Sequence, residues 1–266
     1  MKQKVIWSAQ LLLVLLCALG LKAFYSSATA DDLLWILTPT TVLVELLSGQ
    51  QFEFESYAGY MSSDHRFVIA VSCAGVNFLL TAFLMLGLRR LWRERFQVVS
   101  WRFLPVVAVV AYVTTVIANA VRICIALEIQ QHSVQVSGLT GNQLHRLEGI
   151  VVYFGFLLLL FVLTEKRSAR PNRRLVLFPL VLYYATTLGI PLLNGSFNLE
   201  HSLFVLTLPI LLLATYLLLA FFVGAALRGR PWFMREVQGA VASGLANTDQ
   251  NHGRPRRAAP TVRSAR

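Results

Sequence analysis

Three residues of the chain have the side chains that thiol catalysis needs: Cys73, Arg122 and His145. A free thiol is a weak nucleophile until a base or a nearby cation favours the thiolate. An imidazole can take the thiol proton and later return it to a leaving amine. An arginine stays charged in a dry site, where it can stabilise a thiolate or the oxyanion of a tetrahedral intermediate. These residue types predict nucleophilic catalysis, provided that the fold brings them together.

The composition predicts a membrane protein. Of the 266 residues, 56% are hydrophobic and 14% are charged, and the mean hydropathy is +0.61. About 25% of the residues of a soluble domain are charged, so the composition argues against a soluble enzyme. The three cysteines have no paired spacing, which predicts neither a disulfide framework nor a zinc site. Because the sequence has no P-loop and no dinucleotide-binding motif, we expect no cofactor.

Six stretches have the roughly 20 apolar residues that a transmembrane helix needs: residues 5–25, 67–88, 103–129, 147–164, 175–194 and 203–227. A seventh apolar stretch, residues 33–47, is shorter, and we expect it to form a re-entrant or interfacial helix. The predicted fold is therefore an all-α polytopic membrane bundle, formed by residues 1–227. Residues 228–266 are rich in Arg, Pro, Ala and Gly without apolar periodicity, and they predict a disordered cytoplasmic tail.

Basic residues alternate between the predicted loops. Nearly all of the 24 Lys and Arg residues flank the spans on one side, whereas the loops on the other side hold only Arg66 and Arg146. The positive-inside rule therefore places both termini in the cytoplasm. Since the net charge of +11 comes mainly from these cytoplasmic segments, we expect anionic membrane lipid, and no nucleic acid, beside the basic residues.

This topology brings the three candidate residues to the outer face of the membrane. Cys73 lies near the outer start of the second span and Arg122 near the outer end of the third, so both are about 10 Å below the same boundary. His145 directly precedes the fourth span. Asn119 lies one helical turn before Arg122 and shares its face of the helix. An ionisable residue inside a span, such as Arg122, indicates a functional site.

The first extracytoplasmic segment, residues 26–66, carries six acidic residues against a single basic one, Arg66. Residues 51–55 alternate between polar and apolar, as a half-buried strand does. Gly59 then provides a turn, so we predict a short hairpin over the outer face. Residues 28–30, Ala-Thr-Ala, resemble the cleavage site of a secretory signal peptide. The first span is therefore either retained or removed, and Asp31 lies outside in both cases.

The motifs around the three candidate residues carry a family resemblance. Cys73 lies in Ser-Cys-Ala-Gly-Val-Asn-Phe, Arg122 in Asn-Ala-Val-Arg-Ile and His145 in His-Arg-Leu-Glu-Gly. In the order of these three motifs, and in their positions at the outer ends of predicted helices, residues 33–165 resemble the exosortase/archaeosortase family. The resemblance is closest to the K-type exosortases of that family. The resemblance implies that Cys73 is the nucleophile and that Arg122 and His145 are the second and third catalytic residues. Archaeal members have arginine at the third position, and Arg146 follows His145 here.

The resemblance implies a cysteine protease and transpeptidase of the bacterial inner membrane that sorts secreted proteins. Its substrates carry a C-terminal tail made of a short motif, a transmembrane helix and a basic cluster. Cleavage takes place at the extracytoplasmic face through a thioester. Two other classes remain open: a non-catalytic membrane protein or transporter in exopolysaccharide export, and a membrane thiol acyltransferase. A transporter places polar groups near the midplane of several spans, a pattern that the fifth and sixth predicted spans lack.

The predicted topology is testable with reporter fusions after Gly138 and Asn172. We expect Gly138 to report the extracytoplasmic side and Asn172 the cytoplasmic side, because only the second position lies among clustered basic residues. Enzymatic reporters that are active on one side of the membrane measure this directly. The same compartment for both fusions contradicts the topology and the shared depth of Cys73 and Arg122.

Overall fold

The computed structural model describes residues 2–93, 100–132, 141–166, 177–189, 192 and 199–228. Among these residues, four helices are long and apolar enough to cross a bilayer: α1 (Lys2–Ser27), α3 (Val76–Arg93), α4 (Phe103–Gln131) and α5 (Gly141–Lys166). They coincide with the first four predicted spans. The prediction of a mainly helical chain with several helices of membrane-spanning length is confirmed to that extent.

The fifth and sixth predicted spans correspond to shorter apolar segments. Residues 175–194 contain α6 (Phe178–Tyr184) and a π-helical turn, η4 (Ala185–Gly189). In α8 (Leu199–Arg228), the apolar stretch among the described residues is Val205–Leu219, which is shorter than the four long helices. The described residues therefore show four of the six spans, and the count of six stays a prediction.

The chain divides into two compact units, Met1–Leu213 and Ala214–Arg266. The site described below lies wholly in the first unit. The predicted tail, residues 228–266, begins at the last residue of α8 and otherwise lies outside the described residues.

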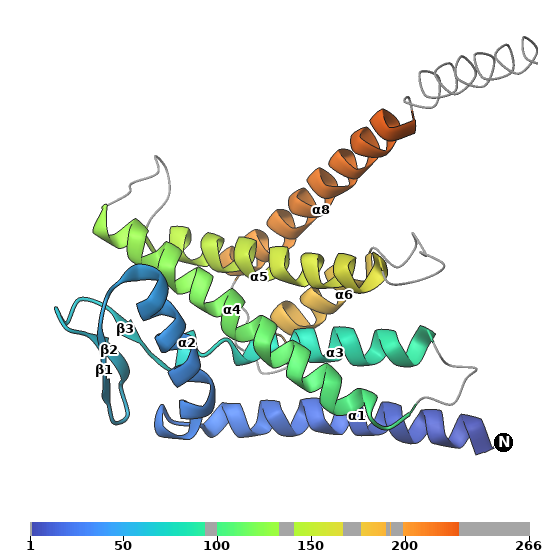
Figure 1. Ribbon diagram of the computed structural model, residues 1–266, viewed down its shortest axis with the longest axis horizontal. Helices are drawn as coiled ribbons and strands as arrows, with labels where there is room; N and C mark the ends of the chain where they lie inside the picture. Colours follow the sequence, from blue (N-terminus) through green and yellow to red (C-terminus); the bar gives the residue numbers. More distant parts are fainter. Residues whose placement is uncertain are drawn as a thin grey trace, which may run out of the picture. The chain divides into compact units, whose positions relative to one another are not determined.

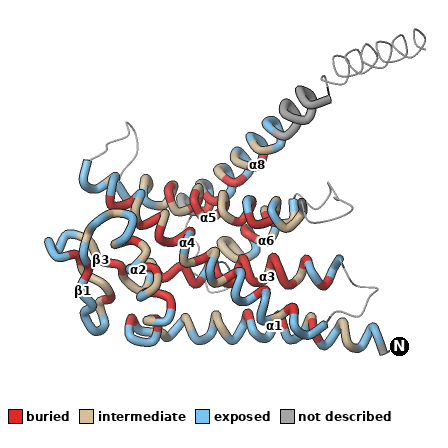
Figure 2. The backbone as a smooth tube through the Cα atoms, in the orientation of Figure 1, coloured by how far each residue is buried: buried red, intermediate tan, exposed pale blue. Residues whose placement is uncertain are grey.

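Helix α3 is the most buried of the four long helices. Helices α1, α4, α5 and α6 all contact it, and 67% of its most apolar segment is buried, against 17% for α1. In Figure 2, buried positions run along α3 whereas exposed positions dominate α1. Helix α3 thus provides the core against which the site is built.

A buried ion pair fixes α3 against α5 at one end of these helices. Arg89 is only 7% exposed and pairs with Glu165. Its guanidinium also donates to the Phe161 carbonyl at 3.0 Å and to the Thr164 hydroxyl, and it lies 4.5 Å from the centre of the Phe161 ring. A buried charge pair needs such additional bonds to offset its desolvation. The sequence pattern places Arg89 in a basic loop, whereas the structure buries it.

A small antiparallel sheet lies at the opposite end. Its strands pair in the order β1 (Phe52–Glu55), β2 (Gly59–Ser62) and β3 (Val68–Ile69). The hairpin predicted from residues 51–55 is therefore present. The chain is mainly helical as predicted, but because it also forms this sheet it is not strictly all-α. Gly59 has a φ of +114°, and a Cβ there would collide with the Ile69 carbonyl, so β2 approaches β3 closely only because this residue is glycine. Figure 1 shows the sheet beside α2, away from the N-terminus.

The predicted re-entrant or interfacial helix is α2 (Leu34–Ser48), which packs on α4. Its 15 residues are too few to cross a hydrocarbon core about 30 Å thick. The Glu45 carboxylate accepts a hydrogen bond from the Phe52 N–H at 2.9 Å, and the hydroxyls of Thr38 and Tyr60 lie 2.8 Å apart. These bonds join α2 to the sheet, so the two form one cap at the helix ends that the predicted topology places outside.

Two exposed carboxylates hold turns in this cap. The N–H and hydroxyl of Thr29 donate to Asp32 at 2.9 and 2.8 Å, which holds the pKa of that carboxyl below its ordinary value. The Ser62 hydroxyl and the Arg66 N–H do the same for the pKa of Asp64. Both carboxylates are ionised at neutral pH, so the cap is acidic where the predicted topology places the outside.

Candidate active site

Cys73 lies in a single 3-10 turn, η2 (Val71–Cys73), which joins β3 to α3. Its carbonyl accepts a hydrogen bond from the side-chain amide of Asn119. Gly75 follows with a φ of +71°, a left-handed conformation that glycine adopts without strain, and α3 begins at Val76. The thiol therefore belongs to a residue just ahead of the N-terminus of α3.

Helix α4 presents a buried polar stripe to the start of α3. Thr115, Asn119 and Arg122 are spaced to share one face of the helix, and none is more than 9% exposed. A Cβ at Gly75 would lie 3.2 Å from Asn119 Cγ and 3.3 Å from Thr115 Cγ2. The glycine thus lets the backbone beside Cys73 pack directly on this stripe.

The guanidinium of Arg122 makes two hydrogen bonds. Nη2 donates to His145 Nε2 at 2.7 Å, and Nη1 donates to the Tyr153 hydroxyl at 3.3 Å. The guanidinium carbon lies 5.5 Å from the centre of the Tyr153 ring, which adds a cation–π contact. A Cβ at Gly149 would lie 3.3 Å from Arg122 Nε, so this glycine leaves room for the guanidinium. These contacts are what a charge buried in an apolar bundle requires.

Tyr153 connects Arg122 to Asn119. Its hydroxyl donates to Asn119 Oδ1 at 2.7 Å, and its ring stacks on Phe78 with centroids 5.0 Å apart and planes 15° from parallel. Asn119 accepts this bond and donates to the carbonyl of Cys73. A chain of hydrogen bonds therefore runs from Arg122 through Tyr153 and Asn119 to the backbone of Cys73.

The structure gathers the three predicted residues but does not join all three directly. Arg122 contacts His145. The Cys73 sulfur lies 4.0 Å from the Ser72 hydroxyl, and the Cys73 carbonyl is connected to Arg122 through Asn119 and Tyr153. Among the described residues, no hydrogen bond joins this thiol to His145. Arg122 is thus the residue that links the other two.

Two neighbours of His145 were not singled out from the sequence. Glu148 Oε2 lies 3.4 Å from His145 Nδ1, and Tyr153 shares Arg122 with His145. The spacing of His145, Gly149 and Tyr153, four residues apart in each case, places them on one face of α5. That spacing was a usable signal. Of His145 and Arg146, the two residues that the sequence offers for the third position of the resemblance, it is His145 whose imidazole contacts Arg122.

A cavity of about 90 Å³ lies beside the turn that holds Cys73. Ser72 and Gly75, on either side of the cysteine, form part of its wall. Residues with hydroxyl groups line it from several helices, among them Tyr25 of α1, Thr81 of α3, Tyr153 of α5 and Thr187 of η4. The cavity therefore combines a mainly apolar lining with a few hydrogen-bonding groups, close to the backbone of Cys73.

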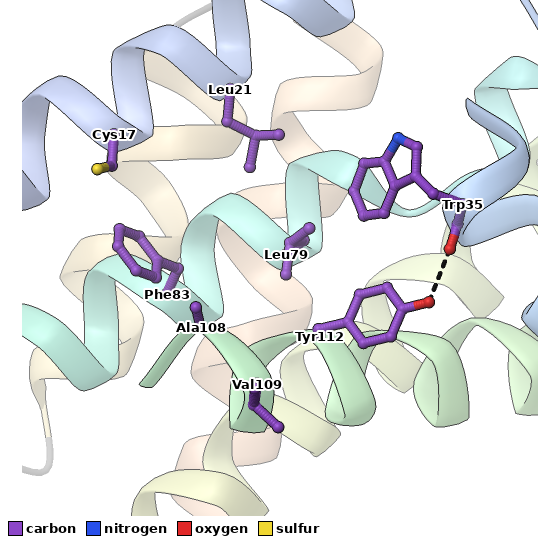
Figure 3. Close-up of a pocket in the computed structure, with 8 residues that line it drawn as sticks. All are labelled: Cys17, Leu21, Trp35, Leu79, Phe83, Ala108, Val109 and Tyr112. Carbon is purple, nitrogen blue, oxygen red and sulfur yellow. Dashed lines mark hydrogen bonds between the residues drawn. The ribbon is translucent and has the colours of Figure 1, made fainter. Parts of the chain in front are cut away.

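A larger cavity of the first unit has fewer polar groups in its lining. It measures about 370 Å³ and lies between α1, α2, α3 and α4, with an almost wholly apolar lining. Figure 3 shows Cys17 and Leu21 on one side and Tyr112 below Trp35, whose carbonyl accepts a hydrogen bond from the Tyr112 hydroxyl at 2.7 Å. The described residues that line this cavity include no cation that could act on Cys17. The candidate site is therefore the one around Cys73.

A pair of glycine substitutions tests whether the stability of the fold and the reactivity of Cys73 depend on the close packing of the turn at Gly75 against α4. Gly75→Ala and Gly49→Ala both place alanine in a left-handed conformation, with φ of +71° and +72°, at roughly 1–2 kcal/mol each. Only the alanine at 75 also presses on Asn119, because the space around Gly49 is open. We expect Gly75→Ala to lower the free energy of unfolding by about 1–3 kcal/mol more than Gly49→Ala.

Thermal unfolding of the two purified variants in detergent measures this difference, and the rate of Cys73 alkylation reports the geometry. Equal stability losses and equal alkylation rates contradict a specific contact between residue 75 and Asn119.

The comparisons with known proteins add no relative to this picture. None of the protein-family models, curated proteins or solved structures compared with the chain matches it. What the chain does must therefore be inferred from its residues and from the geometry of this site.

Proposed function

We propose that the chain is a membrane cysteine protease and transpeptidase of the exosortase type. It cleaves the C-terminal tail of secreted proteins at the extracytoplasmic face of the bacterial inner membrane. The observation that carries the proposal is the buried guanidinium of Arg122, which binds His145 and is connected through Tyr153 and Asn119 to the backbone of Cys73. Burying a charge in an apolar bundle costs free energy. In thiol catalysis, this charge stabilises the thiolate and the oxyanion of the intermediate. The order of the three motifs adds the resemblance to exosortases.

In the proposed first step, the scissile carbonyl enters beside Cys73 and its oxygen takes hydrogen bonds from Arg122. In the free protein, Arg122 occupies Nε2 of His145. Because the carbonyl oxygen competes for the same guanidinium, substrate binding frees Nε2 to accept the Cys73 proton. The thiolate then attacks the carbonyl carbon, and Arg122 stabilises the oxyanion of the tetrahedral intermediate.

The second half of the reaction reverses these proton movements. His145 gives its proton to the leaving amine, the peptide C–N bond breaks and a thioester remains on Cys73. An amine, a hydroxyl group or water then attacks the thioester and passes a proton to His145. That proton returns to the sulfur as the new bond forms. The sorted protein leaves on its acceptor, and the free thiol is restored.

The placement of the site suits a substrate that is itself anchored in the bilayer. The transmembrane helix of a sorting tail ends at the outer boundary, and the scissile bond precedes that helix. Cys73 lies between the outer cap and α3, so it meets a bond at this level. Like the protein, the substrate keeps its basic cluster on the cytoplasmic side.

Replacing the nucleophile tests the proposal. Cys73→Ala should abolish processing of a co-expressed tail substrate while the protein remains inserted, because only Cys73 lies within reach of the charge of Arg122. Cys17→Ala and Cys124→Ala are the matched controls and should process at the parental rate. An immunoblot for the cleaved substrate, beside one for the membrane fraction, measures both.

Parental processing by Cys73→Ala contradicts the assignment. Alkylation of Cys73 that depends on Arg122, without any peptide product, favours the acyltransferase alternative.

The second test is Arg122→Lys. Lysine keeps the charge but offers one nitrogen, so it cannot bind His145 and Tyr153 with the planar fork that both hydrogen bonds use. Losing an oxyanion donor costs about 100- to 1,000-fold in rate, and we expect a loss of this size. Arg89→Lys, at the other buried guanidinium, is the control.

Processing rates normalised to protein abundance separate the two variants. Near-parental processing by Arg122→Lys shows that the residue only anchors its helix, whereas equal losses in both variants indicate a packing effect.

A further inference from the structure

Glu148 is a buried carboxylate that the reaction described above does not use. The residue is 5% exposed and lies in α5, within a segment apolar and long enough to cross the bilayer. Neither carboxylate oxygen has a hydrogen-bond partner among the described residues. A carboxylate in such a place is costly unless a positive charge compensates it. Its position therefore points to a cationic partner, either permanent or formed during the reaction.

The nearest such partner is His145. Glu148 Oε2 lies 3.4 Å from His145 Nδ1, and the carboxylate charge also acts on Arg122 and Tyr153. An arginine can only donate hydrogen bonds, so the contact from Arg122 makes Nε2 of His145 an acceptor. The neutral imidazole then carries its proton on Nδ1. That proton is on the nitrogen nearest to Glu148.

We propose that Glu148 is the positioning residue of the catalytic histidine. It holds the tautomer in which Nε2 is free to take the thiol proton, and it stabilises the imidazolium that forms when the proton arrives. This inference rests on the proposed function, in which His145 is the base. Glu148 acts through His145 and makes no contact with the reacting atoms.

A second Glu–His pair in the chain shows why burial matters. On α4, Glu128 Oε2 lies 3.4 Å from His132 Nδ1, the same separation, but 67% and 68% of these side chains are exposed. Water screens a pair of this kind, which contributes little. The Glu148 side chain is only 4% exposed and that of His145 is 48% exposed, so water screens this pair less than the exposed one. Glu128 thus provides a matched control.

The decisive experiment measures the pH dependence of processing by the full-length protein in membranes. Among the described residues, the charged and titratable groups around His145 are Arg122 of α4 and, on its own helix α5, Arg146, Glu148 and Tyr153, which shares Arg122 with it. Glu148→Gln removes the one negative charge among them. We expect processing to fall about tenfold or more, and the acid limb of the rate profile to move down by about one pH unit.

The direction of the shift follows from the charge. Without the carboxylate, the imidazolium is less stable, so His145 becomes a neutral base at a lower pH. Glu148→Asp restores the charge one methylene further away and should recover part of the rate and most of the profile. Glu128→Gln should change neither. A rate that falls only in proportion to protein abundance, with an unmoved acid limb in Glu148→Gln and Glu148→Asp, overturns the positioning role.

A substrate-free measurement separates this inference from the proposed function. In a background of Cys17→Ala and Cys124→Ala, iodoacetamide reacts with Cys73 alone, and the acid limb of its rate should move down in Glu148→Gln as well. If the parent cleaves no tail substrate but this limb still moves, the protease assignment fails and the pairing of Glu148 with His145 stands. If the parent cleaves and neither limb moves, the protease assignment stands and the positioning role is wrong.

Discussion

The constraint on which the site depends is a single guanidinium that must be satisfied in an apolar bundle. Arg122 is 9% exposed, and it cannot shed its charge. Its two hydrogen bonds and its contact with the Tyr153 ring are the compensation. The residues that surround Arg122 follow from this requirement. Gly149 leaves space for the side chain, and α5 must hold His145 and Tyr153 on the face that meets α4.

The same requirement extends to the cysteine through its neighbours. Tyr153 binds Asn119, and Asn119 binds the carbonyl of Cys73. The left-handed turn at Gly75 allows this contact, because any side chain there would press on Asn119. The position of Cys73 thus depends on a hydrogen bond to its carbonyl from Asn119. Asn119 belongs to α4, the helix that also carries the charge of Arg122. Moving Arg122 by one helical turn, about 5.4 Å, would break the links to the thiol and to the imidazole at once.

The sequence allowed the depth of the site to be predicted, but not its connections. Depth depends on the constant rise of a helix and on the distribution of basic loops, so Arg122 and His145 could be assigned to one face of the membrane. Cys73 was expected inside a continuous second span, whereas Gly75 ends the helix before it reaches the cysteine. The burial of Arg89 also escaped prediction, since its partner Glu165 is far away in sequence. A contact between two helices depends on their rotation, which neither hydropathy nor charge reveals.

Arg89 lies near the C-terminal end of α3, and Arg122, which belongs to α4, lies towards the N-terminal end of α3. The hydrogen-bond partners of these two buried arginines differ in a way that fits their roles. Arg89 meets an ionised carboxylate, Glu165, and the pair is closed by further bonds to Phe161 and Thr164. Arg122 instead donates to an imidazole and a phenol; the nearby carboxylate of Glu148 lies against His145, and no ion pair joins a carboxylate of the described residues to Arg122 directly. A charge left in surplus attracts a negative group, such as a thiolate or an oxyanion, when one forms nearby. The first arrangement fastens two helices, and the second keeps a positive charge ready for chemistry.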